Sequence, residues 1–142
     1  MRFVENTKFR KASEDEISKL EDRIQMYLPE NYKFFLLKNS GGIPIPDRCP
    51  ISAGIGEDKL QLIYSIIHLN NYDFSYWGEI IEVEYIPIGV FTSSSFLLMS
   101  LNERTLGEIF YWDCHTEEFE PPTFNALLPV ADTISDLLLK LY

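Results

Sequence analysis

The residues best suited to nucleophilic or metal chemistry are two cysteines and two histidines: Cys49, Cys114, His68 and His115. Cys114 and His115 stand side by side after Asp113, and a thiol next to an imidazole is the pairing that cysteine nucleophiles use. Neighbouring residues of a strand point to opposite faces, however, so this pair would not readily meet. A zinc site would require all four side chains to converge without the short spacings typical of such sites. The sequence therefore predicts no catalytic residue, no metal site and no cofactor.

Carboxylates are the other group that could carry a function, and they are concentrated in the second part of the chain. The formal net charge is −10, yet residues 1–60 carry 10 basic and 10 acidic side chains. Residues 61–142 carry 12 acidic side chains against only Arg104 and Lys140. A surface with so few cations repels nucleic acid phosphates and anionic membranes, and it attracts a basic partner protein. An acidic composition that serves only solubility is the competing interpretation.

The predicted binding residues are carboxylates around one strand, in one hairpin and after the last strand, with two aromatic side chains that could anchor an interface. They are Glu79, Glu82, Glu84, Glu103, Asp113, Glu117, Glu118, Glu120, Tyr76 and Trp77. Our hypothesis is that these side chains form one continuous acidic face that docks on a basic protein. For any single carboxylate, a solvated surface position is the competing explanation.

Two helices are predicted in the N-terminal part of the chain. Ser13 and Glu16 form a capping box ahead of apolar residues at helical spacing, so the first helix should end before Leu28. A second helix should carry Pro29 in its first turn, where the missing N–H costs nothing. We expect it to be mostly buried through Tyr32, Phe34, Phe35, Leu36 and Leu37. The run Asn-Ser-Gly-Gly at residues 39–42 should end it.

The middle of the chain is harder to interpret. Residues 43–58 are rich in proline and glycine and predict a loop with one short extended piece. In residues 60–80, Leu60, Leu62 and Tyr64 alternate as in a strand, and the segment allows a strand that runs into a helix equally well. Apolar and acidic residues alternate strictly over residues 81–85, which predicts a strand with one wet face. We expect Pro87 and Gly89 to stop that strand.

Two near-continuous apolar runs, residues 95–101 and 108–112, predict central strands that are joined by a hairpin and covered on both faces. The apolar stripe of residues 130–141 predicts a final helix that packs against the sheet, with Asp132 near its start and Lys140 near its end. We therefore expect an α+β fold: a mainly antiparallel central sheet with N-terminal helices and a C-terminal helix packed against it. A length of 142 residues suits a single domain over residues 1–142.

The second helix and the glycines after it are also where a family resemblance begins. Leu28-Pro29-x-x-Tyr32-x-x-Phe35-Leu36, followed by Gly41-Gly42, resembles the opening signature of the SUKH superfamily of Smi/Knr-type domains. The family's order continues with Ile86-Pro87-Ile88-Gly89, an apolar strand at 96–101, Tyr111-Trp112-Asp113 and a Val-Ala-Asp-x-Ile-like run at 130–134. Residues 43–77 match nothing in that pattern.

The resemblance implies a binding function rather than a chemical one. Many bacterial members of the superfamily are immunity proteins that dock on a cognate toxin, often a nuclease, and block it. The expected partner is thus a basic toxin protein. A regulatory or scaffold module of the same fold is the first alternative, and a small hydrolase is a remote one. Each matching position also has a structural explanation in the core or in a turn, so none is assigned a catalytic role.

The expected location is the cytoplasm. Residues 1–6 are too polar for the apolar segment of a signal peptide, and no stretch is long and uncharged enough to span a bilayer. The two isolated cysteines suit the reduced thiols of a cytoplasmic protein. We therefore expect a protein partner, and neither a membrane nor a nucleic acid.

Overall fold

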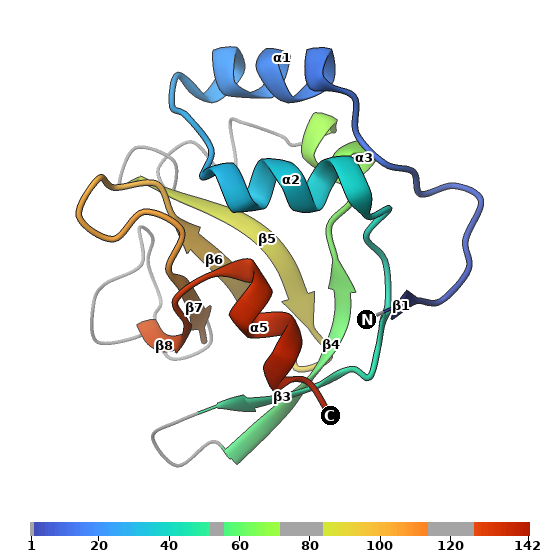
Figure 1. Ribbon diagram of the computed structural model, residues 1–142. Helices are drawn as coiled ribbons and strands as arrows, with labels where there is room; N and C mark the ends of the chain where they lie inside the picture. The colour runs from blue at the N-terminus through green and yellow to red at the C-terminus, as the bar shows by residue number, and fades with distance from the viewer. Residues whose placement is uncertain (1, 52–55, 72–83, 114–126) are drawn as a thin grey trace.

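The computed structural model describes residues 2–51, 56–71, 84–113 and 127–142 (Figure 1). Its strands, in chain order, are β1 (Arg2–Phe3), β2 (Pro44–Ile45), β3 (Arg48–Ile51), β4 (Gly56–Ile63), β5 (Tyr85–Phe91), β6 (Phe96–Ser100), β7 (Ile109–Trp112) and β8 (Leu127–Ala131). Its helices are α1 (Glu14–Ile24), α2 (Glu30–Lys38), α3 (Ile66–Asn70) and α5 (Ile134–Lys140). Within these described ranges, no helix has the length and apolar character needed to cross a membrane.

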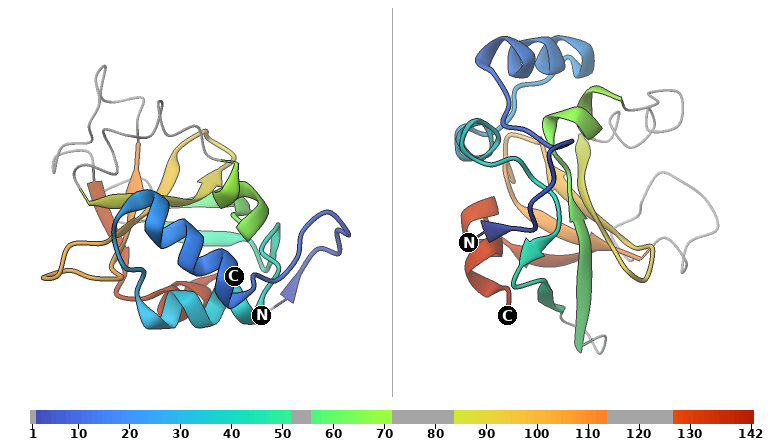
Figure 2. Two further views of the ribbon diagram at one scale, coloured as in Figure 1. Left: turned by 90° about the horizontal axis from the view of Figure 1, so that it is seen from above. Right: turned by 90° about the vertical axis from the view of Figure 1, so that its right-hand side faces the viewer.

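Strands β3 to β8 form one sheet in which every strand pairs antiparallel with its neighbour along the chain. Strands β1 and β2 form a separate small pair. Helices α2 and α5 lie on one face of the large sheet, and α1 lies beside α2 and α3 at one end (Figure 2). In β6, Leu97, Leu98 and Met99 are fully buried, which confirms a central strand covered on both faces. The α+β fold with a C-terminal helix is confirmed.

Helix α1 begins at the capping box that the sequence predicts. The hydroxyl of Ser13 accepts the backbone N–H of Glu16 at 3.2 Å, and the Glu16 carboxylate accepts the Ser13 N–H at 3.0 Å. Ile17, Leu20 and Ile24 then place one apolar stripe in the core. The helix ends well before Leu28-Pro29, as expected.

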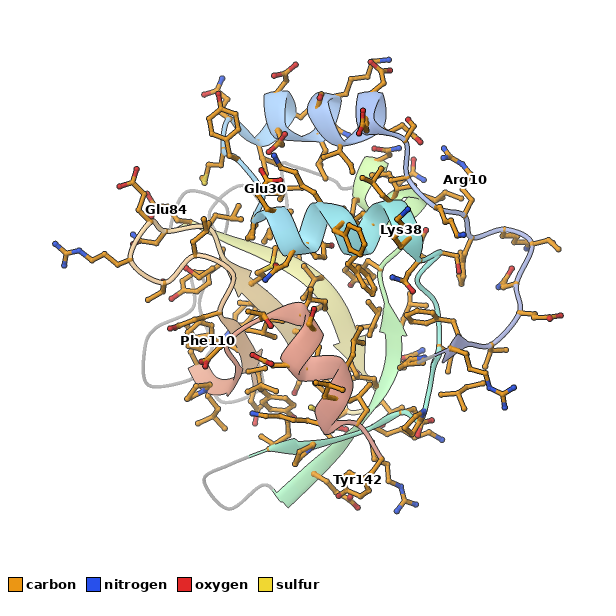
Figure 3. The ribbon with its side chains drawn as sticks, viewed as in Figure 1. Arg10, Glu30, Lys38, Glu84, Phe110 and Tyr142 are labelled. Carbon is orange, nitrogen blue, oxygen red and sulfur yellow. The ribbon has the colours of Figure 1, made fainter. Side chains whose placement is uncertain are left out.

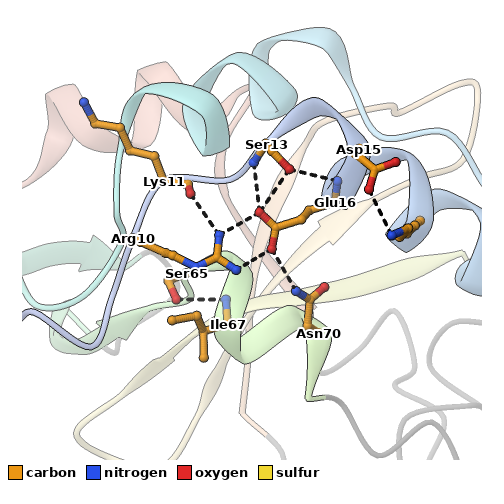
Figure 4. A network of polar contacts seen from close by, with 9 residues as sticks. Arg10, Lys11, Ser13, Asp15, Glu16, Ser65, Ile67 and Asn70 are labelled. Carbon is orange, nitrogen blue, oxygen red and sulfur yellow. Dashed lines mark hydrogen bonds and ion pairs between the residues drawn. The ribbon is translucent and has the colours of Figure 1, made fainter.

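The Glu16 carboxylate also joins three segments of the chain (Figure 4). The Arg10 guanidinium donates two hydrogen bonds to it, at 2.6 and 2.5 Å, and the Asn70 amide of α3 donates a third at 3.4 Å. The bonds from Arg10, followed by those from Ser13, lower the pKa of Glu16 to about 2. The network fixes the N-terminal segment and α3 to the first turn of α1.

Helix α2 differs from its prediction in two details. Pro29 is the N-cap residue rather than a member of the first turn. The helix buries Tyr32, Phe35 and Leu36, but Phe34 is 62% exposed and so lies outside the buried face that the sequence predicts. The reason is helical geometry: positions 32, 35 and 36 share one face, and Phe34 lies on another. The helix ends at Lys38, directly before residues 39–42, as predicted.

Strand β5 overturns the prediction that Pro87 and Gly89 end a strand. It begins at Tyr85 and runs through both residues, while residues 81–83 lie outside the described residues. The pairing with β6 shifts between Pro87 and Gly89, which is the signature of a β-bulge that accommodates a proline. A side chain on Gly89 would meet the Leu62 carbonyl oxygen of β4 at 2.8 Å. Glycine is needed there because two backbones approach closely.

The predicted loop over residues 43–58 is also wrong, because β2, β3 and the start of β4 lie within it. Strand β3 lies at the edge of the sheet, and an edge strand tolerates a proline such as Pro50. The backbone of Tyr142 exchanges two hydrogen bonds of 3.0 Å with Arg48, so the end of the described chain covers this edge. After β4, helix α3 follows, in agreement with a strand running into a helix.

The last helix is shorter than predicted. Val130 belongs to β8, and α5 begins at Ile134 after Thr133, whose hydroxyl accepts a backbone N–H of the first turn at 3.1 Å. Asp132 therefore precedes the helix. Lys140 ends it, and its ammonium group donates to the Val130 carbonyl at 2.6 Å. The apolar stripe continues from strand to helix because both elements face the same core, so periodicity did not locate the boundary.

Candidate protein-interaction surface

Three of the predicted binding residues belong to the part of the chain that the structure describes: Glu84, Glu103 and Asp113. The others lie outside the described residues. They are Glu79, Glu82, Glu117, Glu118, Glu120, Tyr76 and Trp77. The geometry of the candidate surface is therefore built from the first three and from their neighbours.

Glu84 and Glu103 lie at the same end of the sheet. Glu84 directly precedes β5, and Glu103 lies in the turn between β6 and β7. The turn is tied to Glu84 twice: the Leu101 N–H donates to its carbonyl at 2.7 Å, and the Asn102 amide donates to its carboxylate at 2.5 Å. Figure 3 shows the Glu84 side chain directed away from the body of the molecule.

Asp113 lies at the opposite end of the sheet. It follows Trp112, which pairs with Phe96, whereas Glu84 precedes Tyr85, which pairs with Ser100. The four residue steps of β6 between these ends span about 13 Å. The structure thus brings Glu84 and Glu103 together and places Asp113 apart from them.

The hydrogen bonds of the β6–β7 turn hold its shape. The hydroxyls of Ser100 and Thr105 share a bond of 2.7 Å across the turn. The Asn102 side chain oxygen accepts the Arg104 N–H at 3.0 Å, while its amide holds Glu84. Asn102 therefore positions both the carboxylate of Glu84 and the backbone that carries Glu103. Such a preorganised turn needs little further ordering when a partner binds.

Beside the two carboxylates lies a hollow of about 560 Å³ that sequence reasoning missed. Its apolar lining comes from Met26 and Tyr27, after α1, and from Leu101 and Leu106 of the turn. Tyr27 is 82% exposed and Leu106 is 48% exposed. Its charged lining consists of Glu84, Glu103 and Arg104. Because the two apolar segments are far apart in the chain and lie outside regular elements, no periodic pattern could have linked them.

The residues considered for chemistry have unsuitable surroundings where the structure describes them. Cys49 is fully buried in β3, and burial raises the pKa of its thiol to about 12, so it stays protonated. The ring of His68 packs between those of Phe9 and Tyr64, and its Nδ1 accepts the Ser65 N–H at 3.0 Å. Burial also lowers the pKa of His68. Cys114 and His115 lie outside the described residues.

The described residues also offer no cluster of metal ligands. Over residues 2–51, 56–71, 84–113 and 127–142, no group of three or more histidine, cysteine, aspartate or glutamate side chains could hold a metal ion. At the β6–β7 turn, the half-buried Glu84 and the exposed Glu103 lie beside apolar side chains. That combination suits recognition of another protein.

Comparison with known proteins agrees with the motif order described above. A model of the SMI1 / KNR4 family (SUKH-1) matches residues 11–140. None of the curated proteins compared with the chain matches it. The family match covers α1 to α5 and therefore the whole of the large sheet. The chain belongs to the SMI1 / KNR4 family (SUKH-1).

Proposed function

We propose that this chain is a non-catalytic protein-binding domain that acts as an immunity protein: it binds a basic toxin and blocks its activity. The observation that carries the proposal is the hollow beside Glu84 and Glu103, where exposed Tyr27 and Leu106 meet two carboxylates. Exposed apolar groups surrounded by charge are typical of protein interfaces, and tyrosine is a frequent anchor.

The charge of the chain supports a basic partner. The net charge of −10 gives a negative field that accelerates encounter with a cationic protein. Nucleases are such proteins, because their clefts must attract phosphates. In the hollow, Glu84 and Glu103 outnumber the single guanidinium of Arg104, so the local charge is negative, like the net charge of the chain.

The burial of Cys49 supports the non-catalytic part of the proposal. A thiol with a pKa of about 12 is a poor nucleophile at neutral pH. The neutral ring of His68 is occupied by a backbone hydrogen bond and two aromatic neighbours, so it is poorly placed as a general base.

Growth rescue tests the proposal. Where a neighbouring reading frame encodes a toxin domain, that domain is expressed with the wild-type chain or with a Tyr27→Ala/Leu106→Ala variant; absence of such a frame would favour a regulatory or scaffold role. The wild type should restore growth and bind the toxin, and the variant should bind about tenfold or more weakly because two anchors are lost. Leu139→Ala is the matched control, since Leu139 is 84% exposed on α5, away from the hollow.

Two results would contradict parts of the proposal. Absence of rescue by the wild type would contradict the immunity function. Equal rescue and equal affinity for the double variant would remove the hollow from the interface. Thermal melting of each variant ensures that a loss of binding is not a loss of fold.

A further inference from the structure

A second hollow of about 650 Å³ lies between α1 and α2, and the proposed toxin contact does not use it. Its apolar lining is formed by Ile17 of α1 and by Phe34 and Leu37 of α2. Ile17 is nearly buried, whereas Phe34 is 62% exposed. The Lys38 ammonium lies 5.6 Å from the centre of the Phe34 ring, so one face of that ring is already occupied. An aromatic side chain in the lining of an open groove is a potential anchor for a ligand.

The rim of this groove is acidic. Glu14 and Glu21 of α1 and Glu30 of α2 contribute three carboxylates, and Lys33 contributes one ammonium group, for a net formal charge of −2. Lys33 is engaged within the protein, because it pairs with Glu21 at 3.3 Å and with Glu30 at 3.2 Å. Glu21 also accepts the Leu28 N–H at 2.7 Å.

The outer carboxylates of the rim are the ones available to a ligand. The Glu30 side chain is 91% exposed despite its bond to Lys33, and Glu14 is exposed at the start of α1. Figure 3 shows Glu30 and Lys38 at opposite ends of α2. Helices α1 and α2 run in opposite directions, so Glu14, at the start of α1, lies near the end of α2, and Glu30 lies at the other end of the groove (Figure 1). The groove therefore has a carboxylate toward each end and Phe34 in its lining.

We infer that this groove binds a basic amphipathic helix of a partner protein. A third helix can pack in the groove between two neighbouring helices. Its aliphatic side chains would pack on Phe34 and Leu37. The carboxylates of Glu14 and Glu30 would receive its lysine or arginine side chains, and the same carboxylates repel an acidic helix. Helix α2 has 9 residues and is about 14 Å long, so two to three turns of the ligand would be in contact. The inference rests on the proposed protein-binding function and adds a second contact to it.

A peptide probe tests the inference without the toxin. A fluorescent peptide of lysine and leucine at helical spacing is titrated with the full chain, and a glutamate–leucine peptide of the same pattern is the control. The lysine peptide should bind, and the glutamate peptide should bind at least about tenfold more weakly. Phe34→Ala should weaken binding of the lysine peptide about tenfold, Phe34→Leu should restore most of it, and Leu139→Ala should change nothing.

Three results would overturn the inference. They are equal binding of the two peptides, an affinity that Phe34→Ala leaves unchanged, and loss of peptide binding in a Glu84→Lys/Glu103→Lys variant, which would place the peptide on the other hollow. The two proposals fail separately. Loss of toxin binding with intact peptide binding would contradict the proposed function alone, and the reverse would contradict the groove alone.

Discussion

Carboxylates that look alike in the sequence have different roles at the scale of single residues. Glu16 is used internally, since its oxygens accept bonds from Arg10, Ser13 and Asn70. Glu84 and Glu103 are instead presented by a turn at the end of the sheet. The capping box revealed one contact of Glu16, because that contact is local. The contact with Asn70 joins distant segments, so the sequence could not separate a structural carboxylate from a docking one.

The lowered pKa of Glu16 predicts how stability depends on pH. Its pKa falls from the ordinary value of 4.5 to about 2 on folding, so its contribution is complete above pH 4.5 and is lost as the pH falls through about 2. Glu16→Gln should lower the free energy of unfolding at neutral pH by about 1 kcal/mol, since solvent screens this exposed network. At pH 2, where Glu16 is about half protonated in the folded protein, the difference between the variant and the wild type should be much smaller than at neutral pH. Urea unfolding at both pH values checks this, and a difference that does not change with pH would contradict it.

At the scale of elements, the bulge in β5 makes a specific prediction. Gly89→Ala would place a methyl group 2.8 Å from the Leu62 carbonyl oxygen, so β4 and β5 must separate. We expect a loss of about 1 to 3 kcal/mol in the free energy of unfolding. Gly56→Asn is the control: nothing lies within 4 Å of an added Cβ there, and although the φ of +83° strains any side chain, asparagine keeps this cost low, so the variant should lose less stability than Gly89→Ala. Chemical denaturation measures the free energy of unfolding of both variants. Equal stability of Gly89→Ala and the wild type would show that the backbones of β4 and β5 leave room for a methyl group at this position.

Elements defined by local signals could be predicted, and elements defined by distant pairing could not. The capping box set the start of α1, and two apolar runs with a polar connection set β6 and β7. Strand β3 is defined by its pairing with β4, which the local sequence does not reveal, so its proline, Pro50, appeared to belong to a loop. Strand β5 continues past Pro87 because the bulge accommodates the proline.

At the scale of the whole molecule, the acidic second part of the chain does not form one described patch. Glu84 and Glu103 lie at one end of the sheet and Asp113 at the other. The fold also places Tyr27, from the N-terminal part, beside the turn that carries Glu103. Composition predicted the sign of the surface charge, because charge is additive along the chain. The position of the candidate interface depends on tertiary contacts, which composition does not contain.

The most direct test of the account is the association rate constant of the chain with the neighbouring-frame toxin domain, measured by stopped flow from low to high ionic strength. The wild-type rate constant should fall steeply as salt screens the charges. The Glu84→Lys/Glu103→Lys variant should associate about tenfold more slowly at low salt and depend much less on salt. Glu5→Lys/Asp132→Lys, which changes the net charge equally at exposed positions elsewhere, should stay closer to the wild type. Equal rate constants and equal salt dependence for the wild type and the Glu84→Lys/Glu103→Lys variant would contradict docking through this surface.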